Sequence, residues 1–148
     1  MKLRALVIDD SRVMRNMVME SLRRTQLADF DFAEAEDGSD GLVKFNPKTT
    51  DIVFVDWNMP NMSGIDFVRK VRSAHNSCNV PIVMVTSEKS IGKVEEALDS
   101  AGANAYISKP FTIEYMQHKL SSLINEITAR QAAKLSGGFF SKLVGGGG

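Results

Sequence analysis

Short apolar runs alternate along the chain with longer stretches in which apolar residues recur every three or four positions. Runs of four to eight residues rich in β-branched side chains predict strands, and the longer periodic stretches predict amphipathic helices. The predicted strands fall in residues 3–8, 30–32, 51–55, 80–85 and 103–108. The predicted helices fall in residues 11–22, 37–45, 63–71, 91–101 and 112–127. We place Val13, Met14, Met17 and Val43 on the buried faces of their helices.

Five repeats of strand followed by helix predict an α/β fold, with one doubly wound, five-stranded parallel sheet and five helices on its two faces. The runs 52–55 and 80–85 are apolar throughout, which is typical of strands that are covered on both sides. Gly102 follows the fourth helix at the position where glycine commonly ends one.

The periodic pattern fades after about residue 128, and the last residues are rich in glycine. We therefore divide the chain into a domain at 1–128 and a C-terminal helix extension with a glycine-rich tail at 129–148. One interpretation is that the tail is disordered or a linker. The other is that Phe140, Leu143 and Val144 share one helical turn and form an apolar patch that docks on a partner or on the domain itself.

Composition narrows the function classes. Lys plus Arg number 18 and Asp plus Glu number 18, so no net positive charge attracts nucleic acid. The longest apolar runs are too short to span a membrane, and the first four residues do not resemble a signal peptide. A single cysteine, Cys78, forms no internal disulfide. We expect a cytoplasmic protein that binds neither membrane nor nucleic acid.

Polar residues with distinctive chemistry follow four of the predicted strands, namely Asp9 and Asp10, Asp56, Thr86, and Lys109. Ligand sites of open parallel sheets lie at the carboxyl ends of the strands. Three carboxylates at one edge repel one another and call for a counter-cation, for which Mg²⁺ is the first choice and Mn²⁺ an alternative. An aspartate can also accept a phosphoryl group, whose charge a metal and a lysine neutralise. Singly, each residue has an ordinary explanation as a helix cap, a turn residue or a solvated lysine, but together they favour a site.

The segments that carry these residues are Val-Ile-Asp-Asp-Ser (7–11), Val-Asp-Trp-Asn-Met-Pro-Asn-Met-Ser-Gly (55–64), Val-Thr-Ser-Glu (85–88) and Tyr-Ile-Ser-Lys-Pro-Phe (106–111). In this order they resemble the receiver domains of two-component response regulators, most closely the stand-alone chemotaxis type. The resemblance covers roughly residues 1–128. It implies a flavodoxin-like receiver fold with strand order 2-1-3-4-5.

The resemblance also implies a role for each acid. Asp56 is expected to be the phospho-acceptor. Asp9, Asp10 and Asp56 are expected to hold Mg²⁺ together with the backbone carbonyl of Asn58. Lys109 is expected to pair with the phosphoryl group or the acceptor carboxylate. The peptide bond between Lys109 and Pro110 is expected to be cis.

A switch and an output surface follow from the same resemblance. Thr86 is expected to move towards the phosphoryl group, after which Tyr106 rotates inward and changes the face formed by the fourth helix, the fifth strand and the fifth helix. Tyr106, Phe111 and Lys119 are expected on this output face. Asn58 and Glu88 border the path of the hydrolytic water, which predicts relatively fast self-dephosphorylation.

The expected protein is a single-domain regulator and not an enzyme in its own right, although it assists its own phosphorylation and dephosphorylation. Its expected partners are a histidine kinase as phosphodonor, a downstream protein target and a dedicated phosphatase. We expect a monomer or a weak phosphorylation-dependent dimer. Chemotaxis or motility signalling is the first interpretation of the pathway. The alternative is a phosphorelay shuttle or an adaptor, because residues 89–94 lack the paired lysines of chemotaxis receivers.

Two rivals from other classes fit the residues less well. A flavin-binding flavodoxin needs a Ser/Thr/Gly-rich phosphate loop after the first strand, where this chain has the charged segment 9–12. A phosphatase with two acids in the pattern Asp-x-Asp needs an acid at position 58, which is Asn58.

Overall fold

A computed structural model describes residues 2–74 and 78–145, with side chains up to Leu135. Five parallel strands form one sheet in the order β2-β1-β3-β4-β5. The strands are β1 (Lys2–Ile8), β2 (Asp29–Ala35), β3 (Ile52–Val55), β4 (Ile82–Thr86) and β5 (Ala105–Ser108). The predicted fold class and strand order are confirmed.

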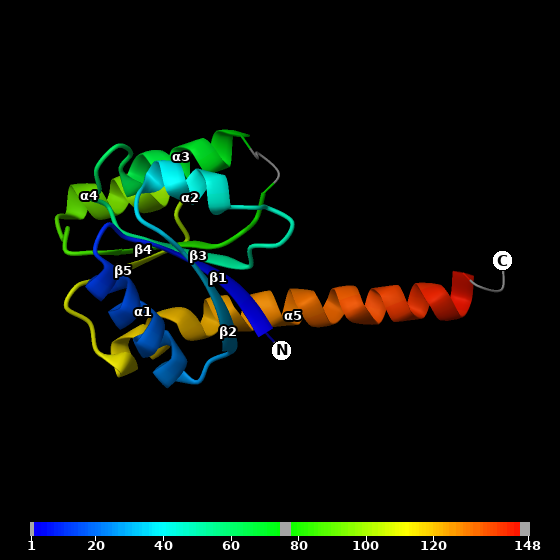
Figure 1. The fold of residues 1–148 in the computed structure, drawn as a ribbon. Helices are drawn as coiled ribbons and strands as arrows, with labels where there is room; N and C mark the ends of the chain where they lie inside the picture. The colour runs from blue at the N-terminus through cyan, green and yellow to red at the C-terminus, as the bar shows by residue number, and fades with distance from the viewer. Residues whose placement is uncertain (1, 75–77, 146–148) are drawn as a thin grey trace.

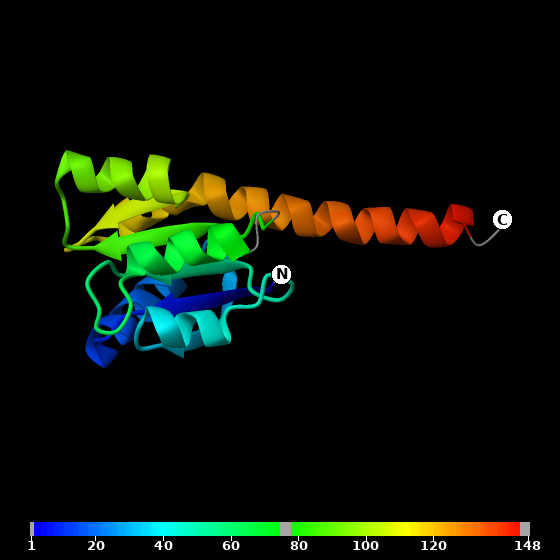
Figure 2. The ribbon, with the colours of Figure 1, turned by 90° about the horizontal axis from the view of Figure 1, so that it is seen from above.

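Helices cover both faces of the sheet (Figures 1 and 2). They are α1 (Arg12–Thr25), α2 (Gly38–Lys44), α3 (Gly64–Ala74), α4 (Ile91–Glu95) and α5 (Ile113–Gly145). A π-helical segment, η1 (Glu96–Ala101), continues α4. It ends at Gly102, whose φ of 97° is left-handed, so the predicted stop is confirmed.

Alternate residues of each central strand enter different cores, as the two-residue period of a strand requires. Val53 and Val55 of β3 pack in the core beneath α2, α3 and η1. Ile52 and Phe54 pack in the core beneath α1 and α5. All four side chains are buried, which explains why β3 is apolar without interruption.

Three residues that we predicted to be buried are exposed. Val13 is 73% exposed, Met17 50% and Val43 83%. The buried stripe of α1 instead runs through Val18, Met19, Leu22 and Thr25. In α2 it is glycine that meets the sheet: a β carbon at Gly41 would collide with Ile8. Val43, two residues further on, therefore points to the opposite side of the helix.

Helix α5 extends well past residue 127, where its predicted apolar stripe ends. It continues as one helix to Gly145 and projects beyond the sheet (Figures 1 and 2). Ile127 is buried, whereas Leu135 is 68% exposed. The side chains of the predicted apolar patch at Phe140, Leu143 and Val144 lie outside the described residues, so that hypothesis stays a prediction. Within the part of the chain that the structure describes, no helix is long and apolar enough to cross a membrane.

Candidate functional site

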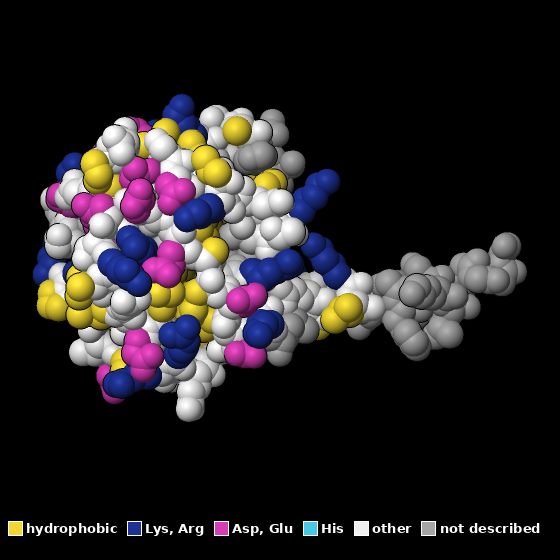
Figure 3. Space-filling model, viewed as in Figure 1, with side chains coloured by type: hydrophobic (Ala, Val, Ile, Leu, Met, Phe, Trp, Pro, Cys, Tyr) yellow, Lys and Arg dark blue, Asp and Glu magenta, His cyan; other side chains and the backbone are white. Residues whose placement is uncertain are grey.

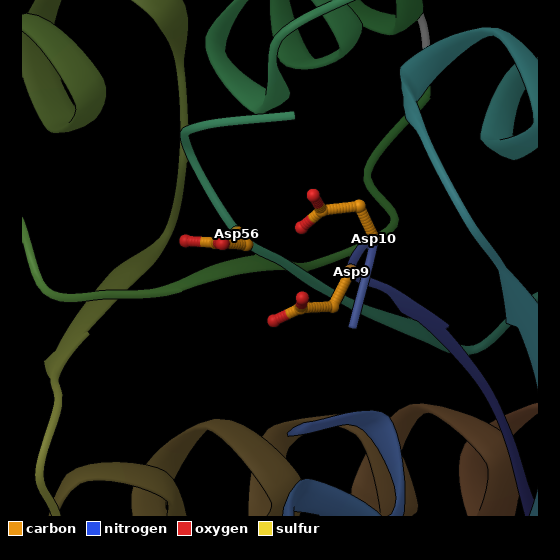
Figure 4. Close-up of side chains that lie close together, drawn as sticks. All are labelled: Asp9, Asp10 and Asp56. Carbon is orange, nitrogen blue, oxygen red and sulfur yellow. The ribbon is translucent and has the colours of Figure 1, made fainter. Parts of the chain in front are cut away.

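Three carboxylates meet at the carboxyl edge of the sheet. Asp9 and Asp10 follow β1 and Asp56 follows β3, and these strands pair in parallel with Ile8 opposite Val55. Each acid offers an oxygen within 4.8 Å of the others. Figure 4 shows the three carboxylate groups turned to the same side. Asp9 is buried, Asp56 is partly buried and Asp10 is exposed.

Main-chain groups fix two of these carboxylates. Oδ1 of Asp9 accepts a hydrogen bond of 2.9 Å from the amide of Ser11, at the start of α1. Oδ1 of Asp56 accepts one of 2.8 Å from the amide of Trp57. In each carboxylate the second oxygen, Oδ2, is left to face the interior of the site.

Lys109 lies between those second oxygens. Its Nζ is 3.0 Å from Oδ2 of Asp9 and 3.6 Å from Oδ2 of Asp56. Its side chain is only 14% exposed. The backbone amide of Lys109 donates to the carbonyl of Thr86, and the peptide bond between Lys109 and Pro110 is cis, as the resemblance implied.

The electrostatics favour an added cation. Burial raises the pKa of Asp56, the positive charge of Lys109 lowers it, and the negative charge of Asp9 raises it again. One ammonium thus faces three carboxylates and leaves negative charge uncompensated. An all-oxygen donor set of this kind fits a hard divalent cation such as Mg²⁺.

Thr86 and Tyr106, which belong to the neighbouring strands β4 and β5, both interact with Asp56. Thr86 is fully buried, and its hydroxyl lowers the pKa of Asp56 by hydrogen bonding. The Tyr106 ring is 6% exposed, and its hydroxyl donates a bond of 2.7 Å to the carbonyl of Glu88. Burial, followed by the charges of Glu88 and Asp56, raises the pKa of Tyr106 to about 12. The ring of Tyr106 is thus already buried in this structure, and its expected rotation with movement of Thr86 stays a prediction.

Loop contacts join the carboxyl ends of β3 and β4. Nδ2 of Asn58 donates a hydrogen bond of 2.9 Å to Oε1 of Glu88. Nζ of Lys93, on α4, lies 4.6 Å from the ring centroid of Trp57. Sequence reasoning missed the Lys93–Trp57 contact, since no local pattern indicates that residues so far apart meet.

The predicted output residues do not form one exposed patch. Tyr106 is buried, Phe111 packs partly against the core beneath α1 and α5, and Lys119 is exposed. Nζ of Lys119 lies 5.7 Å from the ring centroid of Tyr115, which is itself 36% exposed.

The fold and this site together define a doubly wound α/β protein whose acidic edge is built around a lysine. The response regulator receiver domain family model matches residues 5–121, and the chain belongs to this family. The chemotaxis protein CheY1 of Helicobacter pylori is 40% identical over 123 residues, which are 82% of this chain and 97% of the relative. CheY4 of Vibrio cholerae has a solved structure with a TM-score of 0.66 and 33% identity, covering 78% of this chain and 93% of that one.

A third similar structure is the complex of CheX with CheY, BeF3 and Mg²⁺ from Borrelia burgdorferi. It has a TM-score of 0.73 and 22% identity, and the match covers 82% of this chain and 88% of that one. Receiver domains are regulatory phospho-acceptors of bacterial two-component signalling, and the family binds Mg²⁺ at an acidic pocket. The cluster of Asp9, Asp10 and Asp56 is compatible with that role.

Proposed function

We propose that this chain is a stand-alone response regulator that accepts a phosphoryl group from a histidine kinase on Asp56, with Mg²⁺. The observation that carries this proposal is the position of Lys109, whose Nζ is within 3.0 Å of Asp9 and 3.6 Å of Asp56. A phosphoryl group on Asp56 would place its negative oxygens beside this ammonium.

In this mechanism Oδ2 of Asp56 forms the new oxygen–phosphorus bond while the phosphorus–nitrogen bond of phosphohistidine breaks. The leaving imidazole keeps the electron pair of that bond. Lys109 neutralises charge on the transferred group, and the Thr86 hydroxyl donates a hydrogen bond to it. Asp9, Asp10, Asp56 and the carbonyl of Asn58 would hold Mg²⁺, which supplies further positive charge when bound.

The switch is a shift between two arrangements of one surface. A hydrogen bond from Thr86 to the phosphoryl group would favour the buried position of Tyr106, whose hydroxyl is bonded to Glu88. Tyr106 lies on β5, so its position affects the packing of α4 and α5 and with it the output face that includes Phe111 and Lys119. A downstream protein then binds that face.

The rate of dephosphorylation is controlled by Asn58 and Glu88, two loop residues that border the acceptor. Their hydrogen bond of 2.9 Å sets the width of the approach that a hydrolytic water would use. We propose relatively fast self-dephosphorylation and sensitivity to a dedicated phosphatase. The Borrelia burgdorferi CheY, which shares this fold, is found in complex with a second protein, CheX.

Chemotaxis or motility is the pathway that we propose, because the relatives at 34–40% identity are named chemotaxis proteins. A phosphorelay shuttle or adaptor is the second candidate. It is favoured by α4, where Ile91 is 78% exposed and the helix passes into a π-helical segment after five residues. Capture of partners with and without beryllofluoride separates the two, since a shuttle binds a second phosphotransfer protein and a chemotaxis regulator binds a motor component.

The test of the acceptor uses Trp57, the only tryptophan, which is buried and adjoins Asp56. Its fluorescence is titrated with Mg²⁺ and then with beryllofluoride, in the native chain, in Asp56→Asn, and in Asp66→Asn as a control at an exposed acid on α3. We expect a saturable Mg²⁺ response and a further change with beryllofluoride that only Asp56→Asn abolishes. A beryllofluoride response that survives in Asp56→Asn would exclude Asp56 as the acceptor.

A further inference from the structure

An open cavity of about 550 Å³ lies at the end of the sheet opposite the acidic cluster. Its walls come from the segments that precede β3 and β4, from the end of α3 and from α5. Because β3 and β4 run parallel, their amino ends lie at the edge opposite to Asp56. The cavity is therefore separate from the proposed phosphoryl site.

The extended part of α5 builds one wall. Ile127, Arg130, Gln131 and Lys134 line the cavity, and all four lie beyond residue 121, where the match to the receiver model ends. Arg130 and Lys134 are four residues apart and share one face of the helix. The cavity thus depends on this chain's own continuation of the helix.

The charges at the cavity are predominantly positive. Lys48, Arg130 and Lys134 line it, and Asp51 is the acid among the lining residues. Both oxygens of Asp51 are engaged: Oδ2 accepts from the amide of Arg4 at 2.7 Å and Oδ1 from Gln131 Nε2 at 3.1 Å. In Figure 3, Lys and Arg side chains, with acidic ones among them, lie where α5 leaves the body of the domain.

Glu126 competes for one of these cations, Arg130. It lies 3.8 Å from Arg130, and both side chains are more than half exposed. Water screens a pair of this kind, so it holds Arg130 weakly and leaves its guanidinium able to bind another anion.

Gln131, which also lines the cavity, has a polar atom without a partner among the described residues. Its Oε1 is buried and accepts no hydrogen bond from any residue that the structure describes. The amide cannot be turned around to relieve this, because Nε2 is the donor that Asp51 requires. A buried acceptor without a partner is unfavourable. A small rotation of the Gln131 side chain that brings Oε1 to the cavity surface would let a ligand with an N–H or O–H group satisfy it.

We propose that this cavity binds a small organic phosphate. Its phosphate would lie among Lys48, Arg130 and Lys134, since arginine and lysine form charge-assisted hydrogen bonds with phosphate. The organic part would pack on the apolar walls at Pro81 and Ile127 and donate a hydrogen bond to Gln131. The volume falls within the roughly 300–1,000 Å³ that is usual for small-molecule sites.

The test is calorimetry on the full chain without Mg²⁺, with phenyl phosphate, 1-naphthyl phosphate and adenosine monophosphate as probes. Adenosine and inorganic phosphate are the controls for the two halves of the ligand. We expect at least one ester to bind more tightly than both controls. In the double variant Arg130→Gln/Lys134→Gln the dissociation constant should rise about tenfold or more, because charge-assisted bonds are lost.

A second double variant, Lys70→Gln/Lys89→Gln, removes the same charge from exposed positions outside the cavity and should bind like the native chain. The rate at which neutral iodoacetamide alkylates Cys78 gives an independent measurement. Cys78 is the only cysteine and lines the cavity, so a bound ester should slow its reaction.

The proposal is overturned if none of the esters binds, if adenosine binds as well as its monophosphate, or if the two double variants lose affinity equally. Unchanged alkylation of Cys78 at saturating ester would also overturn it. All variants should keep the Mg²⁺ response of Trp57, so failure here is distinguishable from failure of the phosphorylation proposal.

Discussion

Gly64, the first residue of α3, lies so close to Asp56 that a β carbon at position 64 would collide with the carbonyl oxygen of Asp56. The amide of Gly64 also donates a hydrogen bond of 2.9 Å to the carbonyl of Trp57. The loop that leaves β3 therefore closes tightly on the start of α3, and this closure sets the position of the Asp56 backbone.

We expect Gly64→Ala to displace that backbone. Overpacking of this kind costs about 1–3 kcal/mol of unfolding free energy. Urea unfolding should show the loss, and the Mg²⁺ response of Trp57 should weaken because Asp56 moves relative to Asp9. Native stability together with native Mg²⁺ affinity would contradict this account.

Gly92 is the matched control, because it is helical but a β carbon there meets nothing within 4 Å. Alanine restricts the unfolded chain more than glycine does, so Gly92→Ala should stabilise the protein by about 0.5–1 kcal/mol. A higher urea midpoint with an unchanged Mg²⁺ response is the expected result. A loss of stability would mean that α4 needs the freedom of glycine at this position.

Removing Lys109 should separate metal binding from phosphorylation. In Lys109→Ala, Mg²⁺ should bind more tightly, because the ammonium that lies 3.0 Å from Asp9 no longer competes for that oxygen. The rate of phosphorylation by a small donor such as acetyl phosphate should fall about a hundredfold, as when one charge-stabilising group is lost. The exposed Lys89→Ala is the control. An unchanged rate would show that Lys109 does not stabilise the transferred group.

The order of the elements and the acidic edge could be predicted from the sequence because both follow from local rules. Apolar runs specify strands, and parallel pairing brings their carboxyl ends to one edge, so Asp9 and Asp56 are expected at the same edge of the sheet. That their strands are direct neighbours was implied by the resemblance to receiver domains, and the structure has this pairing. The side-chain positions of Thr86 and Lys109 near these acids follow from the same rule.

Other features depend on contacts that no local pattern contains. Val43 matches a helical period, yet it is exposed because Gly41 gives α2 its close approach to the sheet. The Lys93–Trp57 contact joins residues far apart in the sequence, and no local pattern indicated that η1 is π-helical. The extension of α5 without a break to Gly145 could not be derived from the pattern, because the apolar periodicity fades after about residue 128 and the last residues are rich in glycine.

The Tyr106 hydroxyl should ionise at a higher pH than an ordinary tyrosine. Its raised pKa of about 12, against an ordinary value of 10.0, means that the folded chain keeps a proton which the unfolded chain loses first. Stability should therefore fall as the pH rises from about 10 to about 12. Tyr106→Phe should remove that dependence, measured by urea unfolding across this range, and remove the late component of the tyrosinate absorbance. A native chain whose two tyrosines both ionise near the ordinary value would contradict the burial of this hydroxyl.

The Asn58–Glu88 hydrogen bond should control the lifetime of phosphorylated Asp56. Because the two side chains contact each other, the effects of Asn58→Ala and Glu88→Ala on the dephosphorylation rate should not multiply. We expect the double variant to differ from the product of the single effects by more than about twofold. The decay of the phosphorylated chain, followed after removal of acetyl phosphate, gives the rates. The native chain should decay in minutes, and a lifetime of many hours would refute the assignment.

The proposed boundary near residue 128 makes a prediction about the two halves of α5. Ile124 and Ile127 are buried, whereas the exposed Leu135 adds little to the core. Removing residues 136–148 should therefore change the unfolding free energy by no more than about 0.5 kcal/mol and leave the Mg²⁺ response of Trp57 intact. Ending the chain after residue 122 removes both buried isoleucines. The unfolding free energy should then fall by about 2–5 kcal/mol or more, since the loss of one buried isoleucine side chain already has a cost in this range. Urea unfolding of both truncated chains measures these differences.

If loss of 136–148 destabilises the domain as strongly as the longer truncation, the extension is part of the folded unit and the boundary at 128 is wrong. If stability is unchanged but affinity for a captured partner falls, the apolar positions Phe140, Leu143 and Val144 act in docking.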